Sequence, residues 1–169
     1  MTHKCTLAVS TLAITVSFGL AAMAGELPKE GTYKGTYSAV GTFKVNQVDK
    51  DHAFSTLDET GLQLTDGVFD HTTWHCFGGS EIIKGQAVDQ GHCIATDLAG
   101  DKFVSKFISE KHALDQKTFT VTATCEGGTG KYVGMTCNET DIVRGNEFPS
   151  PPEGTYVVYV TLSGTYKLP

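Results

Sequence analysis

The chain has 169 residues, of which 40% are hydrophobic and 9% aromatic, and its 13 basic and 19 acidic side chains give a formal net charge of −6. This length suits one domain of ordinary size, which buries about two-thirds of its unfolded surface. The acidic balance, without basic clusters, argues against nucleic acid and anionic membrane surfaces as partners.

Residues 1–24 have the pattern of a secretory signal peptide. A basic start precedes an apolar run over 5–20, and the small residues Ala22 and Ala24 stand where a signal peptidase reads the chain. The run is marginal for spanning the ~30 Å of a bilayer core. We therefore predict cleavage near Ala24, a single domain over 25–169, and a secreted or periplasmic protein without stable membrane insertion.

Four cysteines follow the signal segment: Cys76, Cys93, Cys125 and Cys137. An even number in a secreted chain predicts two disulfides, for which three pairings exist. We favour pairing of sequence neighbours, Cys76 with Cys93 and Cys125 with Cys137, because each pair can bridge one hairpin. Metal ligation by thiolates is the alternative, and the absence of a C-x-x-C spacing argues against it.

Apolar and polar residues alternate with a period of two along most of the chain, and no long helical pattern interrupts them. Over 31–45 the odd positions are aromatic or small and the even positions are mostly polar, which predicts a half-buried strand. Further strands are expected at Ala53–Glu59, Phe69–Phe77, Gln86–Thr96, Lys102–Ser109, Thr118–Cys125, Lys131–Asn138 and Tyr156–Leu168.

Turn residues separate most of these strands, at 66–67, 78–80, 99–101 and 127–128. Residues 111–116 could form one helical turn, and the proline-containing segment 144–154 reads as an exposed loop. The first and last strands share the sequence G-T-Y-K, and pairing them would remove both exposed edges. We predict an all-β fold, a single closed antiparallel barrel of about eight strands, calycin-like and stapled by disulfides.

The segment Gly127–Gly134, G-G-T-G-K-Y-V-G, resembles a turn-and-strand pattern of the allene oxide cyclase-like and dirigent-like barrels. Residues 70–76 and 96–102 are similar to the secreted bacterial members of that superfamily, whose function is unknown. The resemblance implies an eight-stranded barrel with an apolar cavity, in which some members shape or cyclise small molecules. No catalytic residue of the enzymes can be matched to a position in this chain, so catalytic residues stay unknown.

The apolar parity of the strands selects the residues that would line such a cavity. They are Tyr33, Tyr37, Phe43, Phe119, Val121, Tyr156, Val158 and Val160, with the odd positions of 33–45 and the even positions of 156–168 facing inward. Trp74, the only tryptophan, either packs over the disulfide at Cys76 or stacks on a ligand at the barrel mouth.

Several histidines are candidate metal ligands, but strand geometry argues against a metal site. His71 and His75 would lie on one face ~13 Å apart, too far to share a zinc ion. His75 and His92 would lie diagonally on one face if Cys76 pairs with Cys93, yet two ligands do not complete a site. We predict no metal and no cofactor, with His75 and His92 as the residues to examine.

Acidic residues near strand ends, such as Glu59 and Asp70, could do acid–base work only in a perturbed environment that a sequence does not reveal. We expect the barrel to bind a small apolar molecule in its interior. The alternatives are an isomerase or cyclase of the allene oxide cyclase type and a structural secreted protein with a filled barrel. An open pocket with a buried carboxylate or histidine would favour the enzyme. Ligand identity and oligomeric state do not follow from the sequence.

Overall fold

The computed structural model describes residues 28–145 and 152–169, which leaves the predicted signal segment and part of the 144–154 loop outside the described residues. Eight strands form the wall of a barrel: β1 (Glu30–Asp49), β2 (His52–Thr65), β3 (Thr72–Ile83), β4 (Gln86–Thr96), β5 (Lys102–Ser109), β7 (Thr118–Gly128), β8 (Thr136–Arg144) and β9 (Thr155–Lys167). A short strand, β6 (His112–Ala113), pairs with β4, and a 3-10 turn, η1 (Gly130–Tyr132), precedes β8. The described part contains no helix long and apolar enough to cross a membrane.

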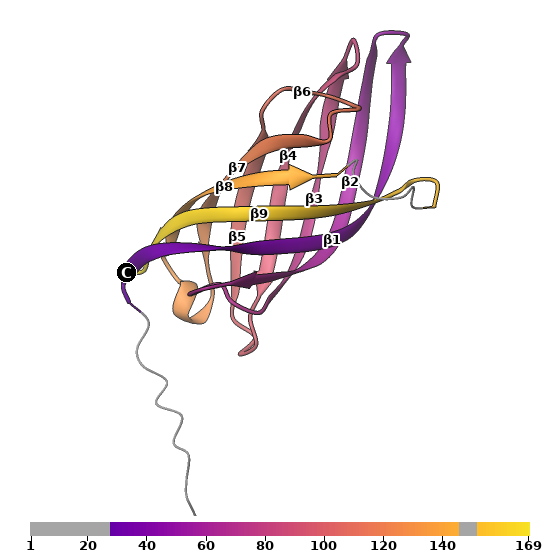
Figure 1. The fold of residues 1–169 in the computed structure, drawn as a ribbon. Coiled ribbons are helices and arrows are strands. Elements are labelled where there is room, and N and C mark those ends of the chain that lie inside the picture. Colours follow the sequence, from indigo (N-terminus) through magenta and orange to yellow (C-terminus); the bar gives the residue numbers. More distant parts are fainter. Residues whose placement is uncertain (1–27, 146–151) are drawn as a thin grey trace, which may run out of the picture.

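The sheet closes on itself, as predicted. β1 runs beside β9 and pairs with it antiparallel along residues 30–42 (Figure 1). In the hydrogen-bonded order of the wall strands β3 is first and β4 is last, and these two strands also pair with each other, which closes the ring. Each wall strand therefore has two hydrogen-bonded neighbours, which leaves no open sheet edge in the wall. Closure also gives every strand one face toward the interior and one toward solvent. Residues that alternate along a strand therefore point alternately inward and outward.

The glycines at 78–79 do not make a turn, and this corrects the sequence-based prediction. They lie within β3, and the hairpin to β4 turns instead at Lys84 and Gly85, which have φ angles of 51° and 73°. A Cβ at Gly78 would overlap the carbonyl oxygen of Gln90 on β4. These glycines therefore permit a close approach of backbones, a use of glycine that local composition does not distinguish from a turn.

Other predicted boundaries also change. The strand predicted at 131–138 begins only at Thr136, because residues 130–132 form η1, and Val133 in the following turn is exposed. Residues 111–116 contain β6 and a turn in place of a helical turn. The strand predicted at 53–59 extends to Thr65, and the strand predicted at 69–77 begins at Thr72 and extends to Ile83. Both run further than predicted because pairing in a barrel lengthens strands beyond their local apolar pattern.

Both predicted disulfides are present. Cys76 pairs with Cys93 across the β3–β4 hairpin, where the two residues are direct register partners. Cys125 on β7 pairs with Cys137 on β8, and η1 with its flanking turn lies inside this loop. All four cysteines are buried, so the two bonds staple the inner face of the wall.

An aromatic cluster fills one end of the barrel and is here called the floor. Phe69 and Tyr132 are 1% and 0% exposed, and the ring of Phe103 lies 4.6 Å from Phe69 and 4.9 Å from Tyr132. The rest of the floor consists of Tyr33, Val68, Met135 and Tyr166. Because these side chains come from the β2–β3 connection, β5, η1 and both terminal strands, they tie the end of the barrel together and close it.

Candidate functional site

A cavity of about 930 Å³ occupies the barrel above the floor. All eight wall strands contribute to its lining, and the turns after β1 and β3 surround its mouth. Most of the lining is apolar: Phe43, Val45, Leu57, Trp74, Ile82, Phe107, Phe119, Val121, Val143, Val158, Val160 and Leu162. The interior is thus a cup with one closed end and one open end.

The structure brings most of the predicted ligand-binding residues to this cavity. Tyr37, Phe43, Trp74, Phe119, Tyr156 and Val158 all line it, and so do Val121 and Val160. Tyr33 does not; its ring packs in the floor, 4.6 Å from the ring of Phe69. Trp74 is 6% exposed, its Nε1 donates to Thr72 Oγ1 at 2.8 Å, and its ring meets Phe103, so it forms the boundary between floor and cavity.

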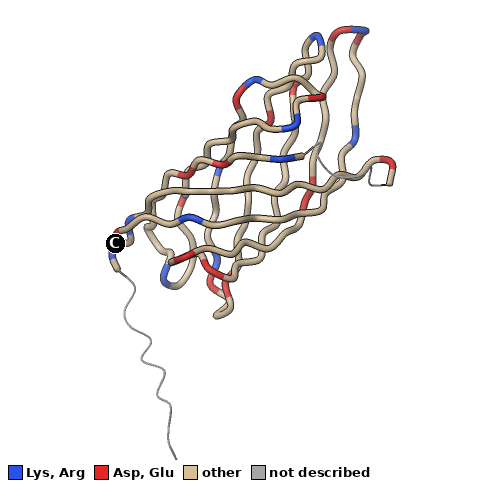
Figure 2. Tube along the Cα trace, in the orientation of Figure 1, with Lys and Arg blue, Asp and Glu red and all other residues tan. Residues whose placement is uncertain are grey.

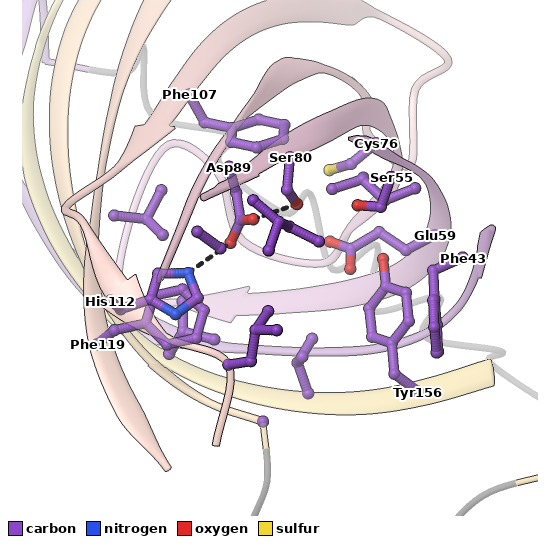
Figure 3. A pocket seen from close by; sticks show the side chains of 18 of the residues that line it. Phe43, Ser55, Glu59, Cys76, Ser80, Asp89, Phe107, His112, Phe119 and Tyr156 are labelled. Atoms are coloured by element: carbon purple, nitrogen blue, oxygen red, sulfur yellow. Dashed lines mark hydrogen bonds and ion pairs between the residues drawn. The ribbon is translucent and has the colours of Figure 1, made fainter. Parts of the chain in front are cut away.

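The first polar group in the cavity is the carboxyl of Glu59 on β2. Tyr37 donates a hydrogen bond to Glu59 Oε1 at 3.1 Å, and the Tyr156 hydroxyl points toward the same carboxyl (Figure 3). Gly41 on β1 is the register partner of both Glu59 and Tyr156, and a Cβ at Gly41 would overlap the tyrosine ring. The absent side chain thus lets Tyr156 reach across one strand to Glu59. Burial raises the pKa of Glu59, although the hydroxyls of Tyr156 and Tyr37 oppose that shift.

A second polar group repeats this arrangement on β8. Gly164 on β9 is the register partner of both Tyr33 and Glu139, and the Tyr33 ring occupies the space that a side chain at Gly164 would need. Asp141 lies two residues beyond Glu139 on the same strand face; Figure 2 shows acidic positions along this strand. Burial, then the charge of Glu139, raises the pKa of Asp141 to about 9. Burial also raises the pKa of Glu139, against the effects of Tyr33 and Asp141.

Nearer the mouth, Asp89 joins Ser80 and His112. Ser80 Oγ donates to Asp89 Oδ1, and His112 Nε2 lies 3.0 Å from Asp89 Oδ2 (Figure 3). The other imidazole nitrogen, Nδ1, lies 3.1 Å from the carbonyl oxygen of Ala113, and the ring stacks on Phe119 at 3.9 Å. Each imidazole nitrogen of His112 therefore lies within hydrogen-bond distance of an oxygen atom, which holds the ring in place beside Asp89.

The histidines considered for metal binding lie on the outer face. His75 Nε2 is 3.2 Å from Asp58 Oδ2, and His92 Nε2 is 3.5 Å from Glu126 Oε2. Their rings flank Phe77, as the predicted register requires, but each pairs with a different exposed carboxylate. Within residues 28–145 and 152–169, no group of three or more His, Cys, Asp or Glu side chains could hold a metal ion.

The sequence-based prediction named Glu59 as an acidic residue near a strand end, but it missed the other carboxyl and imidazole groups inside the cavity, which are Asp89, His112, Glu139 and Asp141. Glu59 shares the inward parity of Ala53, Ser55 and Leu57, and Asp141 shares that of Cys137 and Val143. An acidic residue on the apolar face of an amphipathic strand was therefore the available signal. It marks a carboxyl that faces the barrel interior once the fold is known to be closed, because closure turns that strand face inward.

No protein-family model, no curated protein and no solved structure matches this chain. The resemblance to allene oxide cyclase-like barrels accordingly stays a prediction, and the function has to be argued from the cavity itself.

Proposed function

We propose that this protein is a secreted or periplasmic barrel that binds one small, largely apolar molecule in its interior. The observation that supports the proposal is the cavity of about 930 Å³, lined mainly by apolar side chains and closed at one end by the floor. Pockets for small molecules in proteins typically have volumes of about 300–1,000 Å³. The filled barrel of the structural alternative would leave no such space.

The proposed compartment is supported by the two disulfides and by the signal pattern over residues 1–24. Disulfides form and persist in oxidising environments such as the extracellular space and the periplasm. Mass measurement of the protein recovered from culture medium or periplasm, with a mature start near Gly25, would test this part of the proposal.

Narrowing the cavity is expected to weaken ligand binding without unfolding the protein. Ser55 lines the cavity from β2, so Ser55→Phe places a ring in open space. We expect 1-naphthalenemethanol, a neutral apolar probe, to bind the variant at least about tenfold more weakly, measured by isothermal titration calorimetry, because the ring takes volume that the probe needs. The melting temperature should change by only a few degrees.

The neighbouring Thr56, which faces solvent on the same strand, provides the control: Thr56→Phe should leave binding unchanged. If the interior is packed and not hollow, Ser55→Phe should instead cost about 1–3 kcal/mol of stability. That result, together with no binding of the probe to the unaltered protein, would reject the binding proposal.

A second candidate function, an isomerase or cyclase acting on a small hydrophobic substrate, is favoured by Glu139 and Asp141. Two neighbouring carboxyls with raised pKa values face an apolar cavity, so one can hold a proton at neutral pH while the other accepts one. A positioned acid and base of this kind typically accelerate proton transfer by about 10²–10⁴-fold. Proton transfer to or from carbon is a step that isomerisation and cyclisation share.

Hydrogen exchange in a bound ketone tests this candidate. We expect the protein to speed the exchange of the α-hydrogens of 2-tetralone with D₂O by at least about 100-fold over buffer, followed by NMR. Asp141→Asn combined with Glu139→Gln should abolish the acceleration. Asp58→Asn, which removes an exposed carboxylate from the outer face, should preserve it. Exchange no faster than in buffer would reject the acid–base role.

A further inference from the structure

The charges that line the cavity are unevenly distributed. The basic lining residues are Lys50, His52, Lys84 and His112. Lys50 and Lys84 are exposed at the mouth, His52 pairs with Glu81 at 3.0 Å, and His112 pairs with Asp89. The carboxyls of Glu59, Glu139 and Asp141 have no such cation among the described residues. The interior therefore holds three acidic groups that have no cationic partner, in addition to Asp89, which is paired with His112.

Several buried polar atoms around these carboxyls also lack a hydrogen-bond partner of good geometry within the described residues. They include Tyr33 Oη, Asp141 Oδ1 and Tyr156 Oη, and each of these oxygens can accept a hydrogen bond. Buried polar atoms in folded proteins are almost always hydrogen-bonded. These atoms therefore point to a polar group that enters the cavity with the ligand.

We propose that the ligand is a small apolar molecule carrying one cationic amine, whose ammonium group is held among Glu59, Glu139 and Asp141 while its apolar part contacts the aromatic wall. This inference rests on the proposed binding function and names its ligand class. An ammonium group has three donors, which suits carboxylate and hydroxyl acceptors in charge-assisted hydrogen bonds. Rings of Phe43, Phe107 and Tyr156 line the same space and would favour a nearby cation.

The same arrangement disfavours an anionic ligand such as a fatty acid. A carboxylate placed in the cavity would find no unpaired cation beside it, because the cationic side chains of the lining are those at the mouth or already paired. A buried charge without a counter-ion is costly. A neutral apolar molecule would enter but would leave the acidic groups unpartnered.

Binding of an amine should release a proton from the protein. The titratable groups that interact with Asp141 are Glu139 on its own strand and Tyr33 and Tyr37 on β1. Its register partners on the two neighbouring strands are apolar, Val121 on β7 and Leu162 on β9, and Glu59 and Asp89 line the same cavity. No cation is in this group, and the pKa of Asp141 is raised to about 9, so its carboxyl is protonated at pH 7 in the empty cavity. An arriving ammonium stabilises the carboxylate and drives that proton out.

Calorimetry with matched probes tests the proposal. The probes are 1-naphthalenemethylamine, 1-naphthalenemethanol and 1-naphthoate, together with the n-octyl amine, alcohol and carboxylate. We expect each amine to bind at least about tenfold tighter than its alcohol at pH 7, and the carboxylates to bind most weakly. The heat of amine binding should vary with the ionisation enthalpy of the buffer, which reports proton release, and the heat of alcohol binding should not.

Two variants test which carboxyls cause the preference for amines. Glu59→Gln combined with Asp141→Asn should abolish the preference for amines and keep the affinity for alcohols, which shows that the variant is folded with its cavity intact. Asp58→Asn changes the net charge on the outer face of β2 and should leave the preference unaltered.

The outcomes separate this inference from the proposed function. Failure of every probe in both series to bind would overturn the binding function and the ligand class together. Binding of alcohols with equal or weaker binding of amines would overturn the cationic ligand while leaving the binding function in place. An amine preference that survives in the Glu59→Gln, Asp141→Asn variant would also overturn it.

Discussion

The free energy of unfolding is expected to fall by roughly 1 kcal/mol for each pH unit between pH 5 and pH 8. The cause is Asp141, whose pKa in the folded protein is about 9 against an ordinary value of 3.8, through burial and the charge of Glu139. Between those values the folded state keeps a proton that the unfolded state has released. Stability that is fully present below about pH 4 is therefore lost as the pH rises toward 9, with a limiting slope of about 1.4 kcal/mol per unit for one group.

Urea denaturation at pH 5, 6.5 and 8 measures this slope, and Asp141→Asn should flatten it because an amide does not titrate. Glu59 and Glu139 act in the same direction, since burial raises their pKa values too, so some slope should remain in the single variant. Asp70 and Asp97 have lowered pKa values, and their contribution is lost in a separate window, as the pH falls below their ordinary value of 3.8. A stability that rises from pH 5 to pH 8 would contradict the burial of these carboxyls.

Truncation of Tyr132 is expected to cost about 3–5 kcal/mol, as for other fully buried aromatic residues. Its side chain is 0% exposed, and its ring packs against Phe69 and Phe103 in the floor. Its hydroxyl lies 3.2 Å from the carbonyl oxygen of Val68 and 3.3 Å from Asp97 Oδ2. Tyr132→Ala therefore removes both packing and a polar link between η1 and the β2–β3 connection, and chemical denaturation should show the loss.

The conservative variant separates the two parts of this effect. Tyr132→Phe keeps the ring and should cost only about 1 kcal/mol, the ordinary contribution of one hydrogen bond, plus the cost of leaving acceptors unpaired. Because Tyr132 does not line the cavity, the affinity for 1-naphthalenemethanol should be unchanged in Tyr132→Phe. A loss below about 1 kcal/mol in Tyr132→Ala would show that the floor is not a packed core.

Strand character and disulfide pairing follow from local patterns, which is why they could be predicted, whereas closure was inferred from the matching ends of the chain and the need to cover both sheet edges. In a strand the side-chain period is two, so Cys125 and Cys137 share a face with apolar neighbours whatever the remote strands do. The pairing of Cys76 with Cys93 likewise needs only one hairpin. Strand ends were predicted less well, because pairing with neighbours decides where a strand stops; β3 runs through two glycines that composition marks as a turn.

Residue order along single strands is enough to predict an all-β chain with an apolar inner face that carries four cysteines. Which polar groups meet inside the barrel depends on how distant strands pair. Glu59, Gly41 and Tyr156 belong to three strands, and the register of closure alone places the glycine between the acid and the tyrosine. Closure also sets the radius of the barrel. The inward side chains do not fill the volume that this radius encloses, so a cavity remains instead of a filled core.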